Sequence, residues 1–147
     1  MDDAGAAAFL AEMAAAPIGV PGEWFQMAIA QKSTNDLVGD IGVCRRDDGT
    51  RTAEIGFTMA PFAQGRGLGT EAVKEAATML FAAGHVELIE CITDTRNLPS
   101  IRLLERLGMR LKRTQDTVFK GEKCTEQVYS LILAQWNGIL FTSKFRR

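Results

Sequence analysis

The chain has 147 residues, a length that suits one domain with a buried core and is short for two. Apolar residues make up 46% and charged residues 24%, which is typical of a soluble globular protein and excludes a disordered or fibrous one. The 17 basic and 18 acidic residues leave a net charge of −1, so we expect no general attraction to nucleic acid or to an anionic membrane.

Cysteine usage and the N-terminal residues bear on the cellular compartment. The three cysteines are far apart and form no Cys-x-x-Cys pair, so the sequence predicts neither a disulfide framework nor a zinc site. Asp2, Asp3 and Glu12 stand where a signal peptide would have basic residues, and no apolar run approaches the roughly 18 residues of a membrane span. We therefore expect a cytoplasmic protein with no metal and no membrane partner.

The first half of the chain predicts one helix followed by a strand meander. Residues 4–15 are rich in alanine, with Phe9, Leu10 and Met13 at helical spacing, and predict a short helix that Pro17 closes. Residues 24–30, 37–44 and 52–59 are apolar or alternating and predict three antiparallel strands. Polar turns at residues 32–36 and 47–50 join them.

The second half predicts two helices, a strand between them and a final hairpin. Residues 70–83 predict a helix and 86–93 a buried strand, and Asn97 is a candidate N-cap for a second helix that Gly108 ends. Residues 109–119 and 124–133 alternate around Gly121 and predict the hairpin. The predicted class is α+β, a mixed and mostly antiparallel sheet flanked by helices, in one domain over residues 1–137 with a tail at 138–147.

A glycine-rich loop, Gln-Gly-Arg-Gly-Leu-Gly at residues 64–69, stands between a predicted strand and a predicted helix. Backbone N–H groups at a helix N-terminus converge on an anion, and the helix dipole adds favourable potential. Glycines at 65, 67 and 69 let a diphosphate approach the backbone without obstruction by Cβ atoms. The loop is therefore predicted to bind a phosphate group.

Three other interpretations compete for this loop. A P-loop requires a lysine directly after its last glycine, whereas Thr70 and Glu71 follow here. A dinucleotide fingerprint requires G-x-G-x-x-G after an early parallel strand, whereas the spacing here is G-x-G-x-G after an antiparallel meander. A glycine-rich turn without a ligand is the third, and three alternating glycines at a helix start disfavour it because each costs backbone entropy.

Two motifs together resemble the GNAT superfamily of N-acetyltransferases. Residues 54–69, Glu-Ile-Gly-Phe-Thr-Met-Ala-Pro-Phe-Ala followed by the loop, are similar to its acetyl-CoA motif Q/R-x-x-G-x-G/A. Residues 97–100, Asn-Leu-Pro-Ser, and 104–109, Leu-Glu-Arg-Leu-Gly-Met, resemble its second motif. The resemblance covers about residues 22–136 and is nearest to the branch of ribosomal-protein N-terminal and small-amine acetyltransferases.

The resemblance implies direct acetyl transfer from acetyl-CoA to a primary amine, either a protein N-terminus or a small molecule. The catalytic candidates are Glu54 as base and Ser100 as the hydroxyl near the departing sulfur, with Asp116 as a second choice of base. The candidate acetyl-CoA-binding residues are Thr58, Met59, Gln64, Gly65, Arg66, Gly67, Leu68, Gly69, Thr70 and Asn97. Two plainer interpretations stay open: Glu54 as a solvated or cross-strand-paired glutamate, and Asn97 with Ser100 as a helix cap.

One departure from the family pattern concerns the N-terminus. That branch begins with a strand and a helix, whereas this chain starts at what resembles the second helix, so we expect the sheet to lack its first strand. An exposed sheet edge favours pairing with another chain, which leads to the hypothesis of a homodimer. The alternative function is a non-catalytic acyl-CoA-binding or interaction module that retains the fold.

Overall fold

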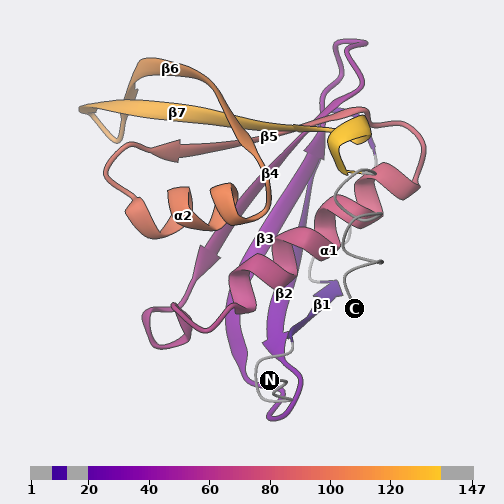
Figure 1. Ribbon diagram of the computed structural model, residues 1–147, viewed down its shortest axis with the longest axis vertical. Coiled ribbons are helices and arrows are strands. Elements are labelled where there is room, and N and C mark those ends of the chain that lie inside the picture. Colours follow the sequence, from indigo (N-terminus) through magenta and orange to yellow (C-terminus); the bar gives the residue numbers. More distant parts are fainter. Residues whose placement is uncertain (1–7, 13–19, 137–147) are drawn as a thin grey trace.

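The computed structural model describes residues 8–12 and 20–136, which form one mixed sheet with two α-helices on one face (Figure 1). The strands are β1 (Ala8–Glu12), β2 (Trp24–Gln31), β3 (Leu37–Arg45), β4 (Thr52–Met59), β5 (Leu88–Asp94), β6 (Arg110–Phe119) and β7 (Glu122–Ile132). The helices are the short 3-10 turn η2 (Pro61–Ala63), α1 (Leu68–Ala82) and α2 (Leu98–Arg106). Residues 133–136 are also helical. This arrangement confirms the predicted α+β class.

The seven strands lie in the order β1-β2-β3-β4-β5-β7-β6. All neighbouring pairs are antiparallel except β4 and β5, which α1 connects as a parallel pair. That pair is short, because Thr52–Glu54 pairs with Leu88–Glu90 and the two strands then separate. Figure 1 shows β4 and β5 diverging toward the end of the molecule where α1 begins. The separation leaves one edge of β4 without a strand partner beyond Glu54.

The core lies between the sheet and the apolar stripe of α1. The buried residues of that stripe recur at helical spacing: Leu68, Ala72, Val73, Ala76, Ala77, Leu80 and Phe81. They pack on alternate residues of the central strands, among them Ile41, Ile55 and Ile89, each at most 2% exposed. Burying one such side chain contributes about 1.5–3 kcal/mol, so the stripe fixes where α1 lies on the sheet.

The end of the sheet is a hairpin of β6 and β7 with a two-residue turn. Lys120 and Gly121 have φ values of 52° and 80°, as a type I′ turn requires at both central positions. Gly121 adopts this conformation at little cost, whereas lysine does so less readily. The predicted final hairpin is confirmed.

The predicted helix over residues 4–15 is wrong where the structure describes it. Ala8–Glu12 is the edge strand β1, antiparallel to β2, with Ala8 opposite Gln31 and Glu12 opposite Met27. Alanine favours a helix only weakly over other states, and pairing the backbone groups along the edge of β2 outweighs that preference. The expectation of a sheet without a strand beside β2 is also wrong, because β1 and not β2 forms this edge of the sheet. The homodimer stays a prediction. Other residues of the predicted helix, and the tail at 138–147, lie outside the described residues.

Candidate active site

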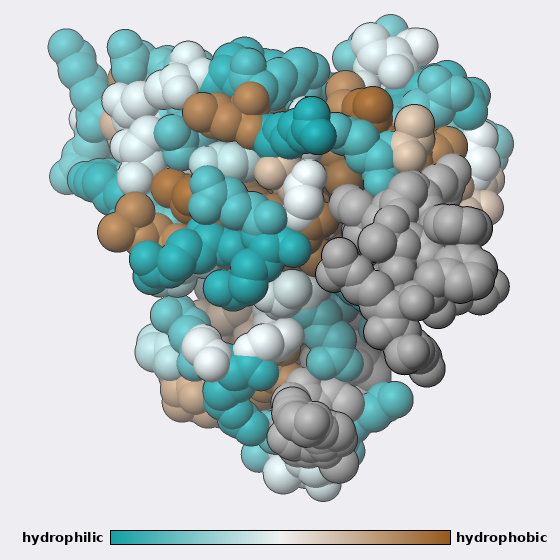
Figure 2. All heavy atoms as spheres, viewed as in Figure 1, coloured by the Kyte–Doolittle hydropathy of each residue, from teal (hydrophilic) through white to brown (hydrophobic). Residues whose placement is uncertain are grey.

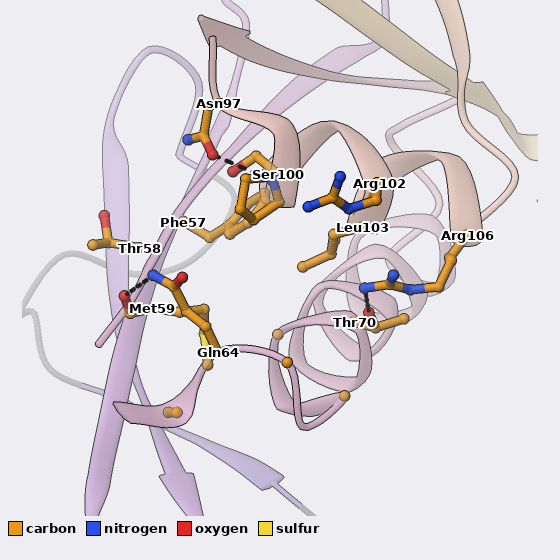
Figure 3. Close-up of a pocket in the computed structure, with 15 residues that line it drawn as sticks. Phe57, Thr58, Met59, Gln64, Thr70, Asn97, Ser100, Arg102, Leu103 and Arg106 are labelled. Carbon is orange, nitrogen blue, oxygen red and sulfur yellow. Dashed lines mark hydrogen bonds between the residues drawn. The ribbon is translucent and has the colours of Figure 1, made fainter. Parts of the chain in front are cut away.

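A cleft of about 480 Å³ opens where β4 and β5 separate. Its walls are the end of β4, the loop that leads into α1, and α2. Figure 3 labels residues of all three walls around the cleft: Thr58 and Met59 on β4, Gln64 and Thr70 by the loop, and Asn97, Ser100, Arg102 and Arg106 by α2. The volume is within the usual range for small-molecule sites.

The glycine-rich loop has the backbone shape of an anion site. Gly65 and Gly67 are left-handed, with φ values of 78° and 80°, and Gly67 is the N-cap of α1. No side chain caps that helix. The N–H groups of Leu68, Gly69 and Thr70 belong to the first helical turn, which has no preceding turn to accept their hydrogen bonds. These amides and the positive end of the helix dipole therefore meet at the cleft.

Gly69 is a point of close approach between α1, α2 and β4. A Cβ atom at this position would lie 2.9 Å from Leu103 Cδ1 and 3.2 Å from Met59 Cγ. The side chain of Gln64 also fixes the end of β4, since its Nε2 donates to the Met59 carbonyl at 3.2 Å (Figure 3). The sequence predicted this loop because its glycines lie close together in the chain.

The α2 wall contains both the predicted cap and two arginines that the sequence analysis missed. The Ser100 amide donates to Asn97 Oδ1 at 3.2 Å, so Asn97 does cap α2. Asn97 and Ser100 also line the cleft, as do Arg102 and Arg106. Arg106 Nη2 donates to Thr70 Oγ1 at 3.5 Å. The spacing of the two arginines, four residues apart on one helix, was the available signal, because it places them on the same face.

Most of the predicted acetyl-CoA-binding residues lie around this cleft. The structure brings together Thr58, Met59, Gln64, Gly65, Gly67, Gly69, Thr70 and Asn97. Leu68 is completely buried in the core instead, and neither it nor Arg66 lines the cleft. The further lining residues that the sequence analysis did not name are Phe57, Ala63, Pro99, Arg102, Leu103 and Arg106. The role of each residue stays a prediction.

Glu54 lies at the last paired position of β4, where the strands part, and is not among the lining residues of the cleft. Its carboxylate accepts a hydrogen bond from Arg46 Nη2 at 3.0 Å. The same Arg46 nitrogen contacts Glu90 at 2.6 Å, so one guanidinium joins the two carboxylates. Asp116, the second candidate base, lies on β6 and accepts from Thr125 Oγ1 at 3.0 Å, outside the cleft.

Glu90 is a buried carboxylate with several cationic partners. Its side chain is 1% exposed, and Lys112 Nζ lies 2.7 Å and Arg113 Nη1 3.7 Å from Oε2. Burial alone would raise the pKa of Glu90, but the hydrogen bonds from Lys112 and Arg46 outweigh it and the pKa is lowered. Glu90 is therefore ionised at neutral pH.

The chain is similar to a known protein family and to two curated proteins. The family model described as an acetyltransferase (GNAT) domain matches residues 1–110 of this chain. The chain belongs to this family. It is 27% identical over 124 residues to the N-acetyltransferase p20 of Bacillus licheniformis, covering 82% of this chain and 69% of that protein. It is 26% identical over 136 residues to the N-acetyltransferase YnaD of Bacillus subtilis (strain 168), with coverage of 82% and 80%.

Solved structures share the fold of this GNAT chain. A Vibrio cholerae protein assigned as a ribosomal-protein-serine acetyltransferase has a TM-score of 0.68 at 24% identity, with 75% of this chain and 64% of that one covered. Mutant forms of SpeG, the spermidine/spermine N-acetyltransferase of Vibrio cholerae, give 0.69 at 15%, covering 79% and 70%. Mycobacterium smegmatis RimJ in complex with CoA-disulfide gives 0.70 at 21%, covering 78% and 55%. The GNAT chain thus spans less than two thirds of the length of the first and third of these proteins.

Two further properties concern the described residues as a whole. Within residues 8–12 and 20–136 there is no helix whose length and hydropathy would allow it to cross a membrane. In the same residues, no three His, Cys, Asp or Glu side chains gather as a metal site would require. Figure 2 shows mostly hydrophilic side chains on the face that α1 and α2 cover, with smaller hydrophobic patches between them.

Proposed function

We propose that this GNAT protein is an acetyl-CoA-dependent N-acetyltransferase that transfers the acetyl group directly to a primary amine. The observation that carries the proposal is the left-handed Gly65 and Gly67 loop, which presents the uncapped N-terminus of α1 to a cleft of about 480 Å³. Such a helix end binds a diphosphate through its amides, and the cleft is large enough for the pantetheine arm as well.

The residues around the cleft fit coenzyme A. The loop amides over residues 64–70 would hold the diphosphate, and the guanidinium groups of Arg102 and Arg106 would add charge from α2. The edge of β4 beyond Glu54 has no strand partner and would hydrogen-bond the amides of the pantetheine arm. Absence of a Cβ at Gly69 keeps the helix close to β4, so the diphosphate and the arm meet at one place.

The chemistry requires a base for the amine, stabilisation of the oxyanion and a proton for the sulfur. The amine nitrogen attacks the thioester carbonyl, so a C–N bond forms and the C–S bond breaks. A backbone N–H at Thr58 or Met59 would stabilise the oxyanion. Glu54, which lies outside the cleft lining, would accept the proton of the amine through water, and the Ser100 hydroxyl would supply a proton to the departing sulfur and regain one from water. The acetyl-CoA thioester provides the activated acetyl group.

The acceptor is a primary amine, on a protein N-terminus or on a small molecule. The named activities of the structural relatives support both classes, because one is assigned to a ribosomal protein and another to spermidine and spermine. The compartment we propose is the cytoplasm, where the free cysteines Cys44, Cys91 and Cys124 would stay reduced. The second candidate function is a non-catalytic acyl-CoA-binding module, favoured by the pairing of Glu54 with Arg46.

The two functions are separated by thiol release from acetyl-CoA in the presence of an amine panel. The panel contains spermidine, an aminoglycoside and peptides with free N-termini of different sequence. The enzyme proposal predicts amine-dependent thiol release with at least one acceptor, and a much lower kcat in Glu54→Gln. Saturable coenzyme A binding without turnover on any amine would instead establish the binding module, and wild-type activity in Glu54→Gln would remove Glu54 from the mechanism.

A further inference from the structure

The β4–β5 ion cluster, which we define as Arg46, Glu54, Glu90, Lys112 and Arg113, lies at the point where the two strands part. Glu54 and Glu90 form the last pair of the β4–β5 ladder, three residues before Phe57, the first residue of β4 that lines the cleft. The Arg46 guanidinium contacts both carboxylates, at 3.0 Å and 2.6 Å, through the same nitrogen. A chain of contacts therefore runs from β6 through β5 to β4.

Stability of the fold is a weak explanation for this cluster. A buried ion pair pays a desolvation penalty that can exceed its Coulombic gain, and apolar residues of similar volume often stabilise a protein as well or better. Glu90 is 1% exposed, and the next residue, Cys91, belongs to the apolar core. The cluster also holds the carboxylate of Glu54, whose side chain is 28% exposed, through its contact with Arg46.

We propose that Glu90 is a positioning residue: by holding Arg46 it fixes the Glu54 carboxylate where β4 and β5 part, between one cationic and one anionic neighbour. The proposal rests on the proposed function, in which Glu54 is the base. The Arg46 guanidinium attracts the Glu54 carboxylate, and the Glu90 carboxylate on the neighbouring strand repels it. The two neighbours therefore act on Glu54 with opposite signs.

The other titratable groups around Glu54 are thiols. Cys44 lies directly opposite Glu54 on β3, and Cys91 follows Glu90 on β5. Burial raises the pKa of Cys44, and it raises the pKa of Cys91 to about 12, so both thiols are neutral near pH 7. Lys112 and Arg113 on β6 act through their contacts with Glu90. Arg46 and Glu90 are thus the two charged side chains through which the cluster acts on the Glu54 carboxylate.

The test is the pH dependence of kcat for acetyl transfer to the best acceptor of the amine panel. The acidic limb of this profile reports protonation of the base in the enzyme–substrate complex. Arg46→Gln removes a cation and should move the limb to higher pH by roughly half to one unit, whereas Glu90→Gln removes an anion and should move it to lower pH by a similar amount. Both variants should lower kcat severalfold and leave the KM for acetyl-CoA unchanged.

Three controls separate positioning from a general effect on structure. Glu87→Gln is the matched variant, since Glu87 lies three residues before Glu90 and pairs with Arg51 at the surface, with 61% and 48% of the side chains exposed. It should leave the profile unchanged. Arg46→Lys keeps the charge but loses the guanidinium nitrogen that contacts both carboxylates, so kcat should fall without a shift of the limb. In a Glu54→Gln background, neither Arg46→Gln nor Glu90→Gln should move the limb of any residual activity.

The proposal is overturned if the Arg46→Gln and Glu90→Gln limbs move in the same direction, if neither moves, or if the shifts persist without Glu54. Thermal unfolding and coenzyme A binding are measured for each variant. Should Glu90→Gln not fold, Lys112→Gln replaces it: it removes a 41% exposed cation from Glu90 and should move the limb slightly upward, and an unchanged limb would overturn the proposal. Wild-type turnover is measured first, so absent turnover counts against the proposed function and unshifted limbs count against this inference alone.

Discussion

A substitution at Gly67 tests the binding of coenzyme A, because its effect on affinity can be compared with its effect on stability. The φ of 80° at Gly67 is unfavourable for alanine, although a Cβ there would meet no atom within 4 Å. Gly67→Ala should therefore cost about 1–2 kcal/mol of backbone strain, and relief of that strain would turn the loop amides away from the cleft. We predict at least about a tenfold weaker affinity for coenzyme A by calorimetric titration, which corresponds to roughly 1.4 kcal/mol.

The matched control is Gly49, which has a φ of 75° and equally open space around its Cβ position. Gly49 lies in the turn between β3 and β4 and is not a cleft residue. Gly49→Ala should lose a similar amount of stability and keep its affinity for coenzyme A. Equal affinities in the Gly67→Ala and Gly49→Ala variants would show that the loop does not hold the ligand.

Arg102 and Arg106 are predicted to contribute to the affinity for coenzyme A through electrostatic attraction to its phosphates and not through the shape of the cleft. Each guanidinium is exposed at the cleft, so each contact with a phosphate should be weakened by salt. Arg102→Ala and Arg106→Ala should each lower the affinity for coenzyme A by about three- to tenfold at low salt, with a smaller effect at about 0.5 M salt. Arg110→Ala, on the exposed start of β6, is the control and should leave the affinity unchanged.

Pantetheine, which lacks the diphosphate, distinguishes charge from shape in the same titration. Its affinity should be equal in wild type, Arg102→Ala and Arg106→Ala. A loss of pantetheine affinity in these variants would assign the arginines to the wall of the arm rather than to the phosphates.

At the scale of single elements, the sequence predicted those whose signals are local. Residues 52–59 alternate in burial and form β4 over that whole range, and the glycine loop with the apolar stripe after it predicted α1 with a start two residues late. β1 was missed because its conformation depends on the edge of β2, about 20 residues further along the chain, and alanine carries no strand signal of its own.

The site was predictable to the same extent and for the same reason. The loop glycines and the Asn97 cap are short-range patterns, and the structure places them around one cleft. The contact of Arg46 with Glu90 spans 44 residues and exists only because β4 and β5 are neighbours. No local pattern indicates it, so the buried partner of the candidate base could not be inferred before the sheet order was known.

The buried Glu90 carboxylate on β5 and its cationic partners predict how the stability of the fold responds to acid. Because the pKa of Glu90 is lowered in the folded state, its contribution to stability is present above the unfolded value of about 4.3 and is lost as the pH falls through the folded pKa. We predict that the urea midpoint of the wild type falls more steeply between about pH 5 and pH 3 than that of Glu90→Gln.

Asp94 contributes to the same acid sensitivity in every variant. Hydrogen bonds from Arg96 lower the pKa of Asp94 to about 2, so this group also titrates below its unfolded range. The comparison of Glu90→Gln with the wild type removes this common part. Glu87→Gln should give the wild-type curve of urea midpoint against pH. Identical curves for the wild type and Glu90→Gln would contradict the stabilising role assigned to the ionised Glu90 carboxylate.

At the scale of the whole molecule, the sheet is divided into two parts that meet at only three paired positions of β4 and β5. β1 to β4 with α1 form one part, and β5 to β7 with α2 form the other, as Figure 1 shows. The cleft lies between the two parts and takes lining residues from both. A ligand that contacts both walls should therefore stabilise the molecule as a whole, by an amount that rises with the logarithm of its affinity.

The central claim is that the amides at the start of α1 hold the diphosphate of coenzyme A. Calorimetric titration of the purified full chain with coenzyme A at low salt tests it most directly. We predict saturable binding at one site per chain, with the affinity weakened by Gly67→Ala and kept by Gly49→Ala. The absence of saturable binding to the wild-type protein would contradict the assignment of these amides to the diphosphate.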